Sequence, residues 1–260
     1  MPFVNRTHLL ARGLVGYWLM NEGCGNTVRN LANPSFYNGT LTNDASWAAG
    51  KFGSGIECPG TGDYVAVGDN LNPGDGGYVT ILLWCKADDT TERSIFSVAE
   101  SYGSIGRDKC IWLDSSGQPV FYVYNGYPQY ATSSIAVTAG EWFQVVARVS
   151  GAGNQVFVNG VLGGTVPDGT STFNGYTTAE VFIGGQTDSM PADFDGIIDH
   201  CVIWDRALSD HEIADLYIRP FAMFERPSIE LWSAAIVGGG ESGVSISVLA
   251  HHHSQMAGAL

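Results

Sequence analysis

Short runs of β-forming residues, separated by turn residues, recur along most of this chain. Between residues 13 and 204 these runs are interrupted by Gly, Asn, Asp and Pro, and few stretches have helical spacing. This spacing is typical of an antiparallel β-sandwich. Thirty-four glycines in 260 residues agree with many tight turns. We therefore expect an all-β chain with a core large enough for a stable domain.

Two strands and one hairpin are the clearest local predictions. Apolar residues alternate in segments 78–87 and 142–149, so each segment has one face suited to a core. In the second segment Gln144 and Arg148 fall on the opposite face and are expected to point outward. The pair Asn159-Gly160 then supplies the two residues that a type I′ hairpin turn favours.

One short helix is predicted near the end of the β-rich region. The stretch from Ser209 to Glu212 forms a capping box, and Pro220 closes the helical pattern. The composition then changes, with three glycines at 238–240 and three histidines at 251–253. We expect one domain over residues 1–218 and a C-terminal extension over residues 219–260, which is a candidate surface for anchoring or oligomerisation.

Charge excludes one class of partner. Twelve Lys and Arg residues against 26 Asp and Glu residues give a net charge of −14, which repels a phosphate backbone, so nucleic acid is not expected as a partner. No window holds eighteen uninterrupted apolar residues, so membrane insertion is not expected. Arg6, His8 and Arg12 interrupt the first twenty residues, and we expect synthesis in the cytoplasm without a signal peptide.

The cysteines do not suggest a disulfide framework or a zinc site. They are five in number, widely spaced, and include no Cys-x-x-Cys pair. Cys85 and Cys201 lie in apolar runs, where a reduced thiol packs as a small hydrophobic group.

Catalysis on glycans requires a carboxylate pair that the sequence does not supply in its usual form. Retaining glycosidases hold two carboxylates about 5 Å apart, which a Glu-x-Asp strand pattern can provide. None of the ten glutamates has an aspartate two residues later. Asp193, Asp195 and Asp199 cluster without a partner base, which is more typical of a cation site or a solvated edge. We expect no enzymatic activity.

One segment has the composition of a sugar-binding surface. Residues 124–130 alternate aromatic rings with amides and resemble a loop, and rings of this kind stack against sugars while amides bind hydroxyls. We predict carbohydrate binding at Tyr127, Tyr130, Asn125 and Gln129. The alternative is that these rings fill the core or cover a sheet, as most aromatic residues of a sandwich do.

Several motifs, taken in order, resemble the laminin-G-like, concanavalin A-like jelly-roll domains. They span about 210 residues and are Leu14–Glu22, Lys51–Gly55, Tyr78–Ala87, Val156–Gly160, Phe194–Asp199 and Ile203–Ser209. The resemblance implies two packed antiparallel sheets in a jelly-roll sandwich, followed by the short helix and the extension. The segments 5–13 and 216–224 are in turn similar to a subgroup common among phage and prophage structural proteins.

The resemblance also implies a calcium site at the rim of the sandwich. Its ligands would be Asp199 above all, then Asn21 or Glu22 in the first loop, and Asp63. His200 stands where relatives often have a glutamate, and the alternative is a solvated acidic loop. Calcium is the one cofactor that we expect.

The sequence as a whole predicts a non-catalytic module for glycan binding and adhesion, located on a virion as a decoration or tail-fibre protein. Binding would be weak at each site and multivalent. The expected partners are glycans, further copies of the chain in a homo-oligomer, and capsid or tail proteins bound through residues 219–260. A purely structural decoration protein and a glycan-cleaving enzyme are the two alternatives.

Overall fold

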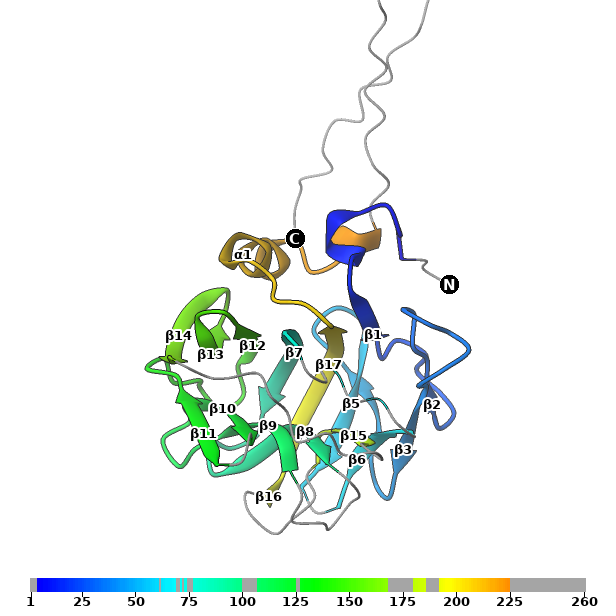
Figure 1. Cartoon of the computed structure of the whole chain (residues 1–260). Helices are drawn as coiled ribbons and strands as arrows, with labels where there is room; N and C mark the ends of the chain where they lie inside the picture. Colours follow the sequence, from blue (N-terminus) through cyan, green and yellow to red (C-terminus); the bar gives the residue numbers. More distant parts are fainter. Residues whose placement is uncertain are drawn as a thin grey trace, which may run out of the picture. The chain divides into compact units, whose positions relative to one another are not determined.

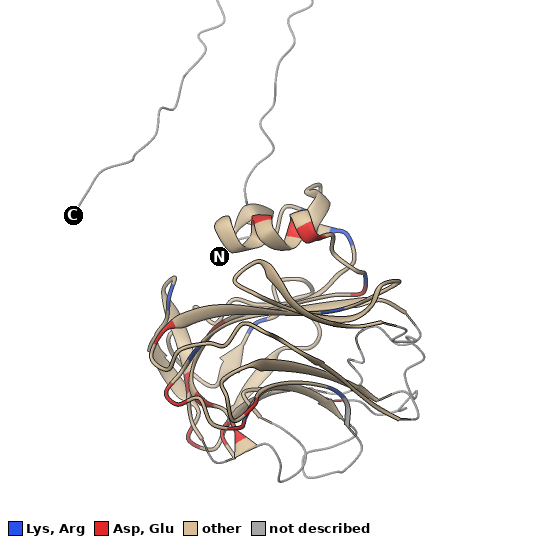
Figure 2. Ribbon diagram, turned by 90° about the vertical axis from the view of Figure 1, so that its left-hand side faces the viewer, with Lys and Arg blue, Asp and Glu red and all other residues tan. Residues whose placement is uncertain are grey.

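The chain folds into two antiparallel β-sheets packed face to face, with a layer of short helices on one of them (Figures 1 and 2). A computed structural model describes residues 4–60, 62–68, 71, 73, 77–99, 107–124, 127–167, 180–185 and 192–224, without the side chains of residues 107 and 108. The architecture is a jelly-roll-like sandwich, as predicted.

The first sheet has eight strands within the described residues, in the order β14-β13-β12-β7-β17-β5-β4, with β1 paired to β17. Their bounds are β1 Leu14–Trp18, β4 Ser46–Ala49, β5 Ser54–Pro59, β7 Val79–Ala87, β12 Trp142–Ser150, β13 Gly153–Val158, β14 Val161–Val166 and β17 Asp195–Trp204.

The second sheet has nine strands in the same described part of the chain, in the order β11-β10-β9-β8-β15-β6-β3-β2, with β16 paired to β8 in parallel. Their bounds are β2 Thr27–Val28, β3 Gly39–Thr42, β6 Tyr64–Val67, β8 Arg93–Ala99, β9 Arg107–Leu113, β10 Pro119–Tyr124, β11 Pro128–Thr132, β15 Glu180–Ile183 and β16 Ala192–Asp193.

The main core lies between the two sheets. Alternate residues of the central strands β7 and β12 enter it, because successive side chains of a strand point to opposite faces. Those predicted to be buried are buried: Val79, Ile81, Leu83, Cys85, Phe143, Val145, Ala147 and Val149. Cys85 and Cys201 are free, buried thiols, as predicted.

A second apolar cluster covers the outer face of the first sheet. It packs sheet residues such as Trp84 and Phe157 beneath the helix α1 (Asp210–Ile218) and the 3-10 turns η1 (Leu9–Ala11) and η2 (Ala222–Phe224). Gln144 and Arg148 were expected to face solvent, and this prediction was wrong because the helix layer buries both.

Polar groups under the helix layer have specific partners. The Arg148 guanidinium donates to Gln155 Oε1 at 2.7 and 2.9 Å and to the carbonyl of Leu208 at 2.5 Å, and it pairs with Asp210 at 2.7 Å. Gln144 donates to the carbonyl of Leu216 at 3.3 Å. These contacts attach α1 to the first sheet.

The predicted helix start and hairpin turn are both confirmed. Ser209 Oγ accepts from the backbone amide of Glu212 at 3.2 Å, and the Glu212 carboxylate accepts from the Ser209 amide at 2.8 Å. Asn159 and Gly160 have φ values of +51° and +79°, which a type I′ turn requires. Asn159 Oδ1 also accepts from the Gln144 amide at 2.8 Å.

The packed part of the chain continues beyond residue 218, the predicted end of the sandwich. Ala222 and Met223 are buried in the second cluster, and the Asn5 amide donates to the carbonyl of Met223 at 2.7 Å. The N-terminal segment and η2 therefore lie side by side (Figure 1). Residues 225–260, most of the predicted extension, are outside the described residues. Among the described helices, none has the length and apolarity needed to cross a bilayer.

Candidate functional site

The hairpin formed by β10 and β11 carries an aromatic surface on the outer face of the second sheet. Phe121 and Ala131 are directly opposite each other and point into the core. Tyr122 and Tyr130, the next pair along the ladder, must then point to the outer face. Tyrosines at these positions are held by a paired ladder, so their rings have a fixed place on the sheet.

Three aromatic rings contact one another on this face. The ring centroids of Tyr122 and Tyr130 are 5.3 Å apart, and that of Trp112 on β9 is 6.0 Å from Tyr122 and 5.9 Å from Tyr130. Tyr130 meets Trp112 edge to face, an arrangement that aromatic pairs favour. Tyr130 is 51% exposed, whereas Tyr122 is buried and Trp112 half-buried. We call these three residues the aromatic face.

The four residues predicted to bind sugar do not all meet here. Tyr130 is on the aromatic face, in a strand where a loop was expected, and Tyr127 is 60% exposed just before β11. Gln129 points the other way, because it is buried and its Oε1 accepts from Asn154 Nδ2 at 2.6 Å. It is therefore not available for a sugar on the outer face. Asn125 lies outside the described residues.

Sequence reasoning did not identify Tyr122 as part of a site. The signal was present in the alternation of residues 119–124, which places Tyr122 opposite in direction to Phe121 and Val123. Tyr122 is a neighbour of Tyr130 only because of the way in which β10 pairs with β11. That register cannot be derived from the sequence alone.

The four predicted calcium ligands each accept a hydrogen bond from a backbone amide. Asp199 Oδ2 accepts from Phe52 at 2.8 Å, and Asp63 Oδ1 accepts from Asp44 at 2.9 Å. In the first loop, the two acceptors are Asn21 and Glu22. Asn21 Oδ1 accepts from Ser54 at 3.1 Å, and Glu22 Oε1 accepts from Arg29 at 3.0 Å.

The predicted calcium site requires these residues to bring several oxygens to one point. Calcium takes six to eight oxygen ligands, so its protein ligands must converge. Within the described part of the chain, no group of three or more acidic, His or Cys side chains is placed to hold a metal. Asp199 is instead buried beside His200, with Oδ1 and Nδ1 3.0 Å apart. Burial, together with this nearby carboxylate, raises the pKa of the Tyr17 hydroxyl far above its usual value.

The remaining carboxylates of the predicted acidic cluster have structural partners. Asp193 Oδ2 accepts from the Gly62 amide at 2.7 Å. Arg93 pairs with Asp89 at 2.6 Å and with Asp195 at 3.4 Å. The hydrogen bond from Arg93 holds the pKa of the Asp89 carboxyl well below its usual range. Asp193 and Asp195 thus fasten the ends of β16 and β17 to their neighbours.

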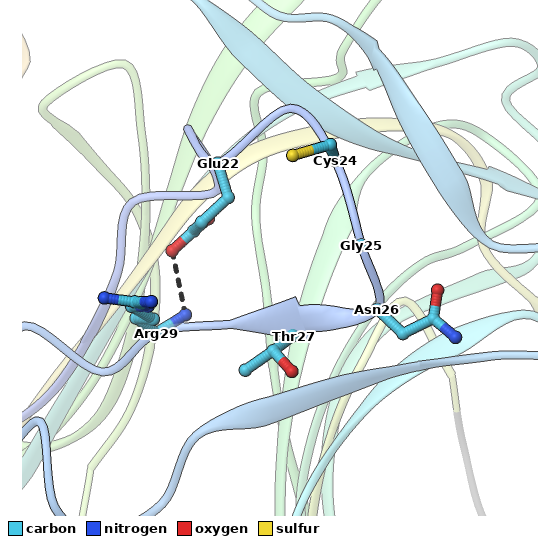
Figure 3. Close-up of a pocket in the computed structure, with 6 residues that line it drawn as sticks. All are labelled: Glu22, Cys24, Gly25, Asn26, Thr27 and Arg29. Carbon is cyan, nitrogen blue, oxygen red and sulfur yellow. Dashed lines mark hydrogen bonds between the residues drawn. The ribbon is translucent and has the colours of Figure 1, made fainter.

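A depression of about 350 Å³ lies around β2 and the loop that precedes it (Figure 3). In the strand order of the second sheet, β2 is at the end opposite to β11. Its walls are Glu22, Cys24, Gly25, Asn26, Thr27 and Arg29. The loop is held by Glu22, which accepts from the Arg29 amide, and by Trp47 Nε1, which donates to the Gly25 carbonyl at 2.6 Å. Its lining includes the thiol of Cys24, the side-chain amide of Asn26 and the hydroxyl of Thr27.

Comparison with known proteins identifies one matching family and several similar folds. Residues 59–214 match the model of the concanavalin A-like lectin/glucanases superfamily. No curated protein matches the chain.

Among solved structures, domain 4 of an extracellular arabinanase from Geobacillus stearothermophilus, solved with arabinotriose, has a TM-score of 0.62 at 19% identity. The match covers 78% of this chain and 98% of that domain.

Two larger proteins contain a similar domain. The binding domain of Paraclostridial Mosquitocidal Protein 1 has a TM-score of 0.64 at 14% identity, with coverage of 82% of this chain and 53% of that one. The Trypanosoma rangeli sialidase has a TM-score of 0.59 at 15% identity, with coverage of 81% and 33%. This chain therefore spans about half of the first and a third of the second, and at these identities the likeness shows the fold alone.

Proposed function

Because the chain belongs to the concanavalin A-like lectin/glucanases superfamily, we propose that it is a non-catalytic carbohydrate-binding module. The observation that carries this proposal is the aromatic face, with Tyr130 half-exposed on a rigid strand pair and packed against Tyr122 and Trp112. The fold is shared by a domain solved with an oligosaccharide, which supports the proposal.

The chemistry of the aromatic face suits a sugar ring. The C–H groups of a sugar pack against the flat face of an aromatic residue, while tyrosine hydroxyls can donate or accept hydrogen bonds. Tyr130 supplies the accessible ring, and its orientation is supported by an edge-to-face contact with Trp112 and a tilted contact with Tyr122. A ring held in place loses little conformational entropy on binding, and this favours affinity.

The absence of catalysis is part of the proposal. Acid–base chemistry on a glycoside needs two carboxylates that can reach the scissile bond. Asp199 and Asp63 are buried acceptors of backbone amides, and Asp195 pairs with Arg93. These contacts support structural roles for three candidate carboxylates. Release of soluble products from arabinan, chitin or other polysaccharides by the purified chain would overturn this part of the proposal.

We propose further that many copies are displayed on a virus particle, as decoration or tail-fibre proteins. The segments that resemble phage structural proteins, 5–13 and 216–224, pack together in the helix layer on the first sheet. The aromatic face is on the second sheet. Residue 224, the last described residue before the extension, lies in the helix layer, on the first sheet and not on the sheet that carries the aromatic face.

Display in many copies would compensate for weak single sites. A millimolar site contributes about −4 kcal/mol, and linked copies can raise avidity by roughly 10² to 10⁴ without new contacts. Deletion of residues 225–260 should abolish attachment to the particle and leave glycan binding by the free protein intact. Full attachment of the shortened chain would contradict the role of the extension.

A glycan array tests the proposed binding directly. We expect signals for the wild-type chain that fall at least 10-fold in Tyr130→Ala. The matched control is Tyr78→Ala, because Tyr78 is 48% exposed and precedes β7 of the first sheet. Equal losses in both variants would contradict the assigned site. An array without signals would contradict glycan binding and favour a purely structural decoration protein.

A further inference from the structure

We infer that the aromatic face selects neutral glycans over glycans that carry carboxylates or sulfates. The inference rests on the proposed function and concerns the same surface. It follows from the chemistry of the side chains around Tyr130 and from the location of the positive charges of the chain.

The described side chains on the outer face of β9, β10 and β11 are uncharged, and those of Arg107 and Asp108, the first two residues of β9, are outside the described part of the chain. Their neighbours Ile111, Phe121 and Ala131 point into the core, so strand alternation assigns every second residue to the outer face. These outer residues are Cys110, Trp112, Val120, Tyr122, Tyr124, Pro128, Tyr130 and Thr132. Tyr122 is on the middle strand, β10, and is directly opposite Tyr130 on β11 and Cys110 on β9.

The Lys and Arg side chains that the structure describes are not on the aromatic face. The chain has twelve Lys and Arg residues, and all of their side chains are described except those of Arg107 and Arg226. Lys109 belongs to β9, but it is buried opposite Val123 on the core-facing side. The other nine are in the first sheet, the helix layer, the loops beside them, the segment after β2, or the start of β8.

Several of these nine cations already have partners. The Lys51 ammonium is 4.8 Å from the ring centroid of Trp84, and Lys86 is 5.8 Å from that of Trp142, both in the first sheet. Arg93 and Arg206 pair with carboxylates at 2.6 and 2.7 Å. None of the described Lys and Arg side chains is therefore placed to pair with an acidic glycan on the aromatic face.

Electrostatics then penalises an acidic ligand twice. Its carboxylate or sulfate loses water on an aromatic surface without gaining a cation, which is unfavourable. The net charge of −14 also repels it from a distance, and salt screens this second effect over about 8 Å at physiological ionic strength. A neutral sugar meets neither penalty.

Matched glycans with and without charge test the inference. The probes are N-acetyllactosamine and its sialylated form, chito-oligosaccharide and hyaluronan, and arabinan oligosaccharide and polygalacturonate, on one array at 50 mM and 300 mM salt. We expect at least 10-fold stronger binding of the neutral member in the pair that binds. The ratio of neutral to acidic binding should be smaller at 300 mM salt than at 50 mM salt.

A charge placed on the face should change this selectivity. Thr132 is exposed on β11, so Thr132→Lys adds a cation beside the aromatic rings. We expect it to raise binding of the acidic member about 3-fold to 10-fold, whereas the uncharged control Thr132→Gln should leave the ratio unchanged. Equal effects of the two variants would contradict an electrostatic origin.

The outcomes separate the inference from the function on which it rests. Equal or stronger binding of the acidic member, lost in Tyr130→Ala, would overturn the selectivity and leave the binding module intact. Binding that is insensitive to Tyr130→Ala, or silence for all probes, would overturn both.

Discussion

Asp199 Oδ2 accepts a hydrogen bond of 2.8 Å from the backbone amide of Phe52, a residue 147 positions earlier in the chain. The other oxygen of the carboxylate contacts His200 Nδ1 at 3.0 Å. Asn21 contacts the same turn, where its Oδ1 accepts from the amide of Ser54 at 3.1 Å. The Lys51–Ser54 turn is therefore held between two side chains that were expected to bind calcium.

Removal of the Asp199 carboxylate should destabilise the fold. Asp199→Ala leaves the Phe52 amide and His200 without this acceptor in a buried place, and we expect a loss of about 2–4 kcal/mol in the free energy of unfolding. Asp199→Asn keeps one acceptor oxygen and should lose less. Urea denaturation measures both values, and an unchanged midpoint for Asp199→Ala would contradict the structural role.

Calcium should not stabilise the described sandwich. A ligand that binds only the folded state raises stability by RT ln(1 + [L]/Kd), so a calcium site would reveal itself in the melting temperature. Because the predicted ligands are used by backbone amides, we expect the same Tm in chelator and in millimolar calcium. A rise in Tm with calcium that disappears in Asp199→Asn would contradict this expectation and support the predicted calcium site.

The sequence predicted the fold well because its strongest signals are local. The capping box at Ser209, the turn at Asn159-Gly160 and the alternation in β7 each depend on neighbouring residues only. The second face of β12 was misjudged for the opposite reason. Arg148 and Gln144 are polar, and only the tertiary packing of α1 shows that their polar groups are buried and paired.

The two members of the ion pair between Arg148 and Asp210 should contribute differently to the free energy of unfolding, because Arg148 is buried and Asp210 is exposed. Arg148→Ala removes several buried hydrogen bonds and should cost about 2–4 kcal/mol of stability. Its partner Asp210 has a side chain that is 71% exposed, so Asp210→Ala should cost less than about 1 kcal/mol. Chemical denaturation of the two variants checks this difference. Equal losses would contradict it.

Acidification should weaken the contact between Arg93 and Asp89. The pKa of Asp89 is lowered in the folded protein by its hydrogen bond to Arg93, while the unfolded value is about 3.9. The stabilisation is thus present above the unfolded pKa and is lost as the pH falls toward the folded pKa. We expect the Tm of wild type to fall more steeply below pH 5 than that of Asp89→Asn. Parallel curves would contradict this coupling.

The candidate site was predicted only in part, and the reason is the register of the strands. The sequence identified Tyr127 and Tyr130 by composition, yet it assigned Gln129 to the same surface. One residue along a strand reverses the direction of a side chain, so Gln129 enters the interior and contacts Asn154. Tyr122 and Trp112 join Tyr130 only through pairing across three strands.

The location of bound sugar is the most direct test of the account. A ¹⁵N-labelled sample of the full chain would be titrated with the neutral oligosaccharide that gives the strongest array signal, and amide and indole shifts would be mapped. We expect the shifts to concentrate on β9, β10 and β11, with the Trp112 indole and the amides around Tyr130 among the largest. Shifts confined to the depression around Cys24 and Arg29, or to the helix layer, would contradict the aromatic face as the binding site.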